Sequence, residues 1–141
     1  MTSPRFIFLA SILLLLQASS LRATSNHEYG PIEYVTVTSG LSPDGKFAIT
    51  AHGGGELGYD NFHLYLTDAV TGKKIGPLEE VKDTLDTGAD AFAAQWSQDS
   101  QQVTIVYRVD RHAPLKAVSY RIITGRRAHR IEGPFDVKSA T

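Results

Sequence analysis

Two histidines and two carboxylates surround a glycine-rich segment. His52 and His63 enclose Gly53-Gly54-Gly55, and Glu56 and Asp60 follow the glycines. Imidazole nitrogens and carboxylate oxygens are common ligands of divalent metals, so these four side chains form a conceivable cage if the two histidines face each other on paired strands. Their spacing matches no recognised metal signature. We interpret them as edge or solvent residues, and we keep a small metal-binding or metal-assisted hydrolytic protein centred on this loop as the alternative function.

Other residues that could do chemistry have a simpler interpretation. Ser42 and Ser97 each precede an aspartate by two positions, but neither belongs to a Gly-x-Ser-x-Gly elbow, and both are typical turn residues. Asp83, Asp86 and Asp90 lack the alternating ligands and the terminal glutamate of a calcium-binding hand, which favours solvated linker acids. The sequence therefore predicts no catalytic residue and no cofactor, and it favours a protein that is not an enzyme.

The net charge and the cysteine content of the chain argue against some classes of protein. The chain has 141 residues, a formal net charge of -1 and no cysteine. A near-neutral charge argues against nucleic-acid binding, which needs a basic excess to release counterions from phosphate. Without cysteine the protein has neither disulfides nor a lipid-modified cysteine, so packing alone must stabilise the fold.

The first residues have the pattern of a secretory signal peptide. Arg5 supplies a positive charge, residues 6–16 are apolar except for Ser11, and small residues follow at Ala18-Ser19-Ser20 and at Ala23. An apolar stretch of this length is too short to span a hydrocarbon layer of ~30 Å as a helix. We expect a signal peptide over residues 1–23, cleaved after Ser20 or Ala23, and a periplasmic or secreted protein with no stable membrane anchor.

The mature chain, 24–141, contains one phrase twice. Leu41-Ser42-Pro43-Asp44-Gly45-Lys46 and Trp96-Ser97-Gln98-Asp99-Ser100-Gln101 each precede an apolar strand, and each copy ends in a Thr-Gly turn, at Thr71-Gly72 and at Thr124-Gly125. Self-similarity at a fixed period is typical of repeat architectures, whose units bury their apolar faces against neighbours. This pattern predicts one two-repeat β domain, with copy one at about 33–76, a linker at 77–88 and copy two at about 89–132.

Strand signals dominate both copies. Segments rich in β-branched and aromatic residues alternate between apolar and polar positions and are separated by turn residues. Residues 77–82 are the only segment that suggests a helical turn or two. Strands are expected at 34–38, 47–51, 62–66 and 73–75 in the first copy, and at 89–96, 103–108, 115–122 and 128–131 in the second.

The repeated phrase resembles the TolB-type β-propeller repeat. Its hallmark is Trp-Ser-Pro-Asp-Gly-Lys followed by an apolar strand and by Leu-Tyr-x-x-Asp-x-x-Thr-Gly. The first copy departs at Leu41, which replaces tryptophan, and the second at Gln98 and Ser100, which replace proline and glycine. The resemblance implies an all-β fold of two four-stranded antiparallel meander sheets resembling propeller blades. Because propellers close with four to eight blades, the two copies leave three arrangements open: a half-propeller or small sandwich, a ring of several copies, or docking on another protein.

A meander of this kind places its short turns at one end and its long connections at the other. Long loops are the usual recognition surface, so the long-loop end is the expected binding face. We therefore expect an exported noncatalytic binding or protein-interaction module. Its partner would be an envelope or extracellular protein, or a second copy of the chain. The expected binding face comprises Glu56, Tyr59, Asp60, Asn61, Asp83, Asp86, Arg111 and His112.

Overall fold

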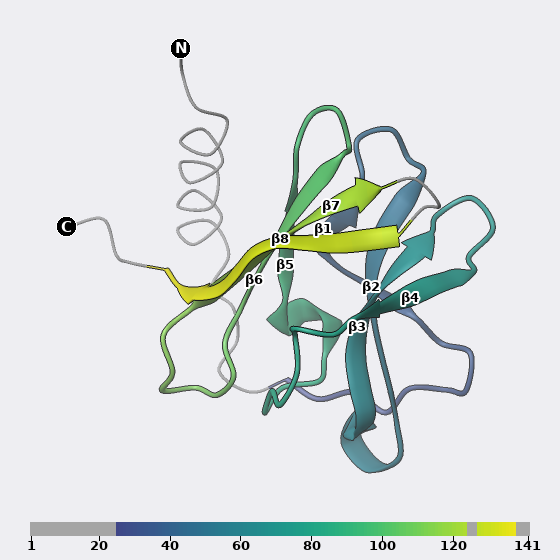
Figure 1. Ribbon diagram of the computed structural model, residues 1–141. Helices are drawn as coiled ribbons and strands as arrows, with labels where there is room; N and C mark the ends of the chain where they lie inside the picture. The colour runs from purple at the N-terminus through teal and green to yellow at the C-terminus, as the bar shows by residue number, and fades with distance from the viewer. Residues whose placement is uncertain (1–24, 124–126, 138–141) are drawn as a thin grey trace.

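The computed structural model describes residues 25–123 and 127–137, and it confirms the prediction of an all-β fold. The expected signal peptide and the second Thr-Gly turn lie outside the described residues. All eight expected strands are present (Figure 1). They are β1 (Val35–Leu41), β2 (Phe47–Gly54), β3 (Asp60–Asp68), β4 (Lys74–Leu78), β5 (Ala93–Trp96), β6 (Gln102–Tyr107), β7 (Lys116–Ile123) and β8 (Arg127–Asp136).

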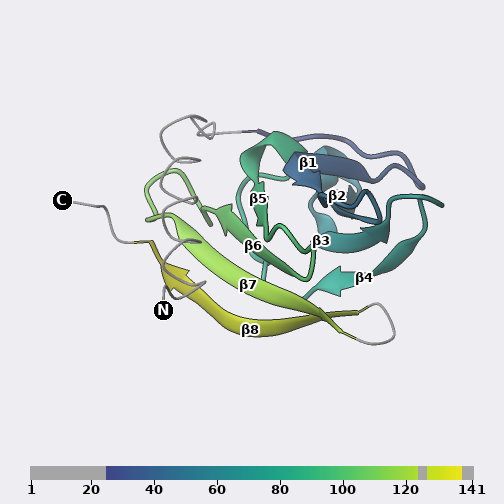
Figure 2. The same ribbon diagram turned by 90° about the horizontal axis from the view of Figure 1, so that it is seen from above.

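The strands form one mixed sheet in the order β4-β3-β2-β1-β5-β6-β7-β8. Within each copy, successive strands pair antiparallel, whereas β1 and β5 pair in parallel at Thr38 and Ala93. The Thr38 amide donates to the Phe92 carbonyl at 3.2 Å across this junction. Seen from above, the sheet curls into a nearly closed ring in which β4 faces β8 (Figure 2). The two copies therefore share a continuous sheet.

A side-chain bridge spans the seam between the two ends of the sheet. The Glu80 carboxylate, just after β4, accepts a hydrogen bond from the Tyr120 hydroxyl at 2.8 Å and lies 3.7 Å from Nε of Arg130 on β8. Burial and the nearby Glu80 raise the pKa of Tyr107 to about 12, and burial raises the pKa of Tyr120 further. Both phenols are therefore neutral at ordinary pH, which suits their place inside the ring.

Alternation along the strands explains how the interior is filled. On β2, for example, Phe47, Ile49 and Ala51 belong to the core, while Ala48 and Thr50 between them point to the opposite face of the sheet and are also buried. Buried hydroxyl side chains on that opposite face pair across neighbouring strands, Thr50 with Thr67 at 2.8 Å and Thr104 with Ser119 at 2.7 Å. The core also contains Val37, Leu64, Leu66, Leu78, Val81, Ala91, Phe92, Ala94, Trp96, Val103, Ile105, Tyr107, Val118, Tyr120 and Ile122.

The repeated phrase forms the same turn in both copies. In the first, the Asp44 carboxylate accepts from the Ser42 hydroxyl at 2.7 Å and from the Lys46 amide at 3.0 Å. In the second, Asp99 accepts in the same way from Ser97 at 2.6 Å and from Gln101 at 3.0 Å. These bonds stabilise the charged carboxylates and lower the pKa of both aspartates. The serines are turn residues, as the sequence predicts.

Ser100 explains why the second turn departs from the repeat pattern. It takes the position of Gly45 and shares its positive φ, 60° against 72°. Its buried hydroxyl accepts a hydrogen bond from the Asp44 amide at 3.1 Å, which joins the two turns. A glycine would fit the backbone better but would lose this link.

We expect Ser100→Ala to lower the free energy of unfolding by about 1–2 kcal/mol, because it loses the hydrogen bond and retains the positive φ. Ser100→Gly also loses the bond, but it relieves about 1 kcal/mol of backbone strain and should be close to neutral. Urea unfolding of both variants measures the difference. If the two variants unfold at the same urea concentration, Ser100 does not carry the strain assigned to it.

Two expectations for local structure are wrong. Residues 77–82 form no helix, because β4 continues to Leu78 and a turn follows. The fifth strand begins at Ala93 and not at Ala89, because Ala89–Ala91 form a 3₁₀ turn. A similar turn, Glu56–Gly58, lies between β2 and β3.

Candidate functional site

The two ends of the sheet differ as expected (Figure 1). Because β1 and β5 run parallel, the short turns of both copies lie at one end, and the long connections after β2, β4 and β6 lie at the other. We call these the short-turn end and the long-loop end. Each contains a candidate site.

An N-terminal segment, residues 25–29, is strapped across the long-loop end. The Ser25 amide donates to the Asp86 carboxylate at 2.7 Å, and the Ser25 carbonyl accepts from the Thr87 and Gly88 amides at 2.9 Å. The Tyr29 hydroxyl donates to the Thr87 carbonyl. Asp86 is therefore buried under the strap and is not available to a partner. No periodic pattern in this segment signals the contact.

Three exposed apolar side chains gather beside the strap. Leu57, Tyr59 and Leu85 are 41%, 43% and 42% exposed, and we call them the loop cluster. The Tyr59 hydroxyl donates to the Leu85 carbonyl at 2.9 Å, while Thr87 donates to the Leu57 carbonyl at 2.5 Å. Asn26 of the strap donates to both the Tyr59 hydroxyl and the Leu85 carbonyl. These hydrogen bonds fix the position of the backbone that carries the three side chains of the loop cluster.

Unusual backbone conformations concentrate at the same end. Leu57, Asn61 and Asp83 have φ angles of 56°, 54° and 58°, in the left-handed region. Asn and Asp tolerate this region, but a leucine there is strained. Strained residues persist only where the surrounding structure holds them, and they are concentrated at binding sites.

The remaining residues of the expected binding face are divided between loops and the start of β3. Glu56 is exposed on the β2–β3 connection that also contains Tyr59, and Asp60 and Asn61 are exposed at the start of β3. Asp83 is exposed on the connection after β4. Arg111 and His112 are exposed on the separate β6–β7 connection, where the His112 amide donates to the Asp110 carboxylate at 2.8 Å. The sequence prediction did not include Leu57 and Leu85. Their exposure could not be read from composition, since leucine usually predicts a buried position.

The two histidines of the alternative site face each other, as the sequence suggests. His52 and His63 are register partners on β2 and β3. However, Nδ1 of His52 donates to the Glu33 carbonyl at 2.6 Å, and its ring stacks on Tyr34 with centroids 4.2 Å apart. Nδ1 of His63 donates to the Asn61 carbonyl at 3.1 Å. Both rings are thus used in local contacts.

The proposed carboxylate ligands do not complete a cage. His63 lies 3.7 Å from the Glu79 carboxylate, and neither Glu56 nor Asp60 shares that contact. Within residues 25–123 and 127–137, no three His, Asp or Glu side chains lie close enough to hold a metal ion. The geometry therefore gives the metal alternative no support.

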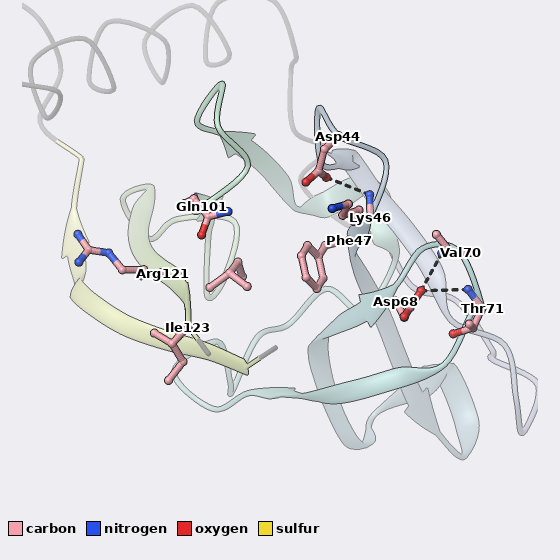
Figure 3. A pocket seen from close by; sticks show the side chains of 10 residues that line it. Asp44, Lys46, Phe47, Asp68, Val70, Thr71, Gln101, Arg121 and Ile123 are labelled. Carbon is pink, nitrogen blue, oxygen red and sulfur yellow. Dashed lines mark hydrogen bonds between the residues drawn. The ribbon is translucent and has the colours of Figure 1, made fainter. Parts of the chain in front are cut away.

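A pocket of about 880 Å³ opens at the short-turn end, between the two copies (Figure 3). The sequence analysis did not expect a hollow there, because it treated these turns as scaffold. Parallel pairing of β1 and β5 places the turns of both copies side by side, which no local pattern reveals. The pocket is lined by Asp44, Lys46, Phe47, Asp68, Val70, Thr71, Gln101, Arg121, Ile122 and Ile123.

The pocket combines apolar residues with a polar rim. Phe47 and Ile122 are almost fully buried and form its apolar part together with Ile123. The two carboxylates act as acceptors within their own turns: Asp44 as described above, and Asp68 from the Val70 and Thr71 amides at 2.9 and 3.0 Å. Such an apolar surface with a few placed polar groups is typical of ligand pockets.

None of the helical segments in the described ranges is long and apolar enough to cross a membrane. Comparison with known proteins gives no assignment: no family model, no curated protein and no solved structure matches the chain.

Proposed function

We propose that this protein is an exported, noncatalytic interaction module that binds an envelope or extracellular protein at its long-loop end. The observation that carries the proposal is Leu57, an apolar side chain held in the left-handed region and 41% exposed to solvent. Burial of an apolar side chain normally stabilises a folded protein. Leu57 instead has a strained backbone conformation and a side chain that remains exposed. A partner that covers the side chain would account for both.

The surroundings of the loop cluster indicate the chemistry of the partner. Hydrogen bonds hold the backbones of the three residues close together, since the Tyr59 hydroxyl donates to the Leu85 carbonyl and the Thr87 hydroxyl donates to the Leu57 carbonyl. On the two connections that contain these residues and at the first residue of β3, the exposed carboxylates outnumber the lysines: Glu56, Asp60, Glu79, Asp83 and Asp90 are exposed, and Lys82 is the single lysine there. A partner segment with an apolar anchor flanked by basic residues would complement this surface.

The polar groups at this end support a binding role more than a catalytic one. The Tyr59 hydroxyl, the Asp86 carboxylate and the Thr87 hydroxyl all hold backbone segments in place. A preorganised surface of this kind lowers the entropic cost of binding.

We also infer that each copy is a blade-like meander, so that the domain is a half-propeller or a small sandwich. The support for this inference is the antiparallel order within each copy and the matching turns at Asp44 and Asp99. The seam bridge at Glu80 brings the two free edges together. That bridge reduces the need for further copies to complete the ring.

Site-specific photo-crosslinking tests the interaction. A photoreactive phenylalanine analogue replaces Leu57 in the full chain, in cells that export the protein. The control replaces Leu41, which is 56% exposed at the end of β1 nearest the short turns. We expect a discrete product of higher mass from position 57 and none from position 41. Excess unlabelled native protein should suppress the product, whereas a Leu57→Asp competitor should not.

Two outcomes would contradict the proposal. Equal products from both positions would show that exposure alone determines the reaction. A product of twice the mature mass would identify a second copy of the chain, in place of another protein, as the occupant of the loop cluster.

A further inference from the structure

We propose that the pocket at the short-turn end is a second, separate binding site, and that it takes a ligand with an apolar body and one carboxylate. The pocket lies at the opposite end of the sheet from the loop cluster and shares no residue with it. Its volume of about 880 Å³ falls within the usual range for small-molecule sites, roughly 300–1,000 Å³. The inference is therefore independent of the proposed interaction at the long-loop end.

The ligand body is indicated by the apolar lining. Phe47 at the start of β2 and Ile122 and Ile123 at the end of β7 come from different copies and lie around the same hollow (Figure 3). Val70 on the β3–β4 turn is 79% exposed at the rim. A ligand that covers these side chains removes apolar surface from water on both copies at once.

The acid head is indicated by the two residues that follow the matching turns. Lys46 and Gln101 hold equivalent positions in the two copies, and both line the pocket. Among the described residues, the Lys46 ammonium forms no hydrogen bond or ion pair, although its charge contributes to the lowered pKa of Asp44. Asp44, its nearest acidic neighbour along the chain, already accepts two hydrogen bonds within the turn. The Gln101 side-chain amide donates one of its two hydrogens to the Asp99 carbonyl at 3.4 Å, which leaves the second for a ligand. A carboxylate that enters the pocket can therefore accept a hydrogen bond from the ammonium and from this second amide hydrogen.

Arg121 does not serve the same purpose. It contributes to the lining, but its guanidinium points away from the hollow (Figure 3). It lies near enough to Asp99 to lower the pKa of that carboxyl. Lys46 and Arg121 thus carry the same charge at the same pocket and face different directions, which makes them a matched pair for a test.

The test is a titration of the mature protein followed by amide chemical shifts. The probes are octanoate, octan-1-ol and octylammonium, which share one apolar body and differ in the head group. Lys46→Gln introduces the residue that the second copy already has at this position, so the turn should tolerate it. Arg121→Gln removes the same charge from the outward-facing position and is the control.

We expect octanoate to shift the amides of Phe47, Gln101 and Ile122, and to bind more tightly than the alcohol or the amine. Lys46→Gln should weaken octanoate binding at least about tenfold, while Arg121→Gln changes it less than about twofold. If both variants lost the same affinity for octanoate, the net charge of the protein alone would explain the effect, and the proposal would be overturned. Equal binding of the three probes, or shifts confined to other parts of the sheet, would overturn it as well.

A second set of probes distinguishes two sources of the same chemistry. A tetrapeptide that ends in leucine with a free carboxylate is compared with its amidated form. Binding of the free peptide, with the same dependence on Lys46, identifies peptide carboxyl termini as the ligand class. If octanoate binds and the peptide does not, the site takes free organic acids.

Discussion

Trp96→Ala is expected to lower the free energy of unfolding by about 3–5 kcal/mol, as is usual for deletion of a buried aromatic side chain. The indole is 7% exposed, and it packs in the core between the two copies. Its Nε1 donates to the Gly40 carbonyl on β1 at 2.9 Å, so truncation also leaves a buried acceptor without its partner. Since total stabilities are about 5–15 kcal/mol, the variant should be largely or fully unfolded at physiological temperature.

Trp96→Phe separates the two contributions. It keeps most of the apolar volume but loses the hydrogen bond to Gly40, so we expect a smaller loss of about 1–3 kcal/mol. Urea unfolding followed by far-ultraviolet circular dichroism gives both values without relying on the indole. A loss below about 1 kcal/mol for the alanine variant would show that this residue does not connect the two copies.

Gly53→Ala is expected to destabilise the fold by about 3 kcal/mol or more, because the new Cβ has no space. It would lie 2.0 Å from the Gly58 carbonyl oxygen, which is backbone and cannot rotate away, and 3.1 Å from the Phe62 ring. The clash falls where the β2–β3 connection turns back on β2. We therefore expect the loop cluster to shift as well.

The neighbouring glycine provides the control. A Cβ at Gly54 would lie 3.6 Å from Asp60, an ordinary contact, and its φ is not in the left-handed region. Gly54→Ala should therefore change the free energy of unfolding by less than about 1 kcal/mol. Thermal melts of the two adjacent variants give the comparison. Equal tolerance at both positions would mean that this part of the connection is loosely packed.

This pair also shows a limit of sequence reasoning. The run Gly53-Gly54-Gly55 suggests a flexible loop, and nothing in its letters distinguishes the three residues. In the structure, Gly53 is buried in β2, and the side chain of Asp60 approaches Gly55 closely. The difference arises from what packs against each residue.

The repeated tyrosine-bearing strand illustrates a similar limit. Tyr65 and Tyr120 occupy similar places in the two copies of the phrase, but Tyr120 belongs to the core, whereas Tyr65 contacts Tyr34 on the other face. Strand alternation has a period of two, so a shift of one residue between the copies moves a side chain to the opposite face. Similar letters therefore do not guarantee similar environments.

Local chemistry was sufficient to predict the all-β class, all eight strands and the shared turn at Asp44 and Asp99. These features are determined by the alternation of apolar and polar residues, by turn residues and by hydrogen bonds between near neighbours. Each of these depends only on a short segment of the sequence. The four-strand pattern and the turn also occur in both copies, so each could be recognised twice in the sequence.

Only the tertiary structure determined where the pocket lies and which residues of the long-loop end are exposed. Parallel pairing of β1 with β5 placed both sets of short turns around one pocket, and the strap at residues 25–29 buried Asp86 while Leu57 and Leu85 remained exposed. These outcomes depend on contacts between residues far apart in the chain, such as Ser25 with Asp86 and Asp44 with Ser100. Such contacts arise from the packing of whole elements, and short-range sequence patterns do not encode them.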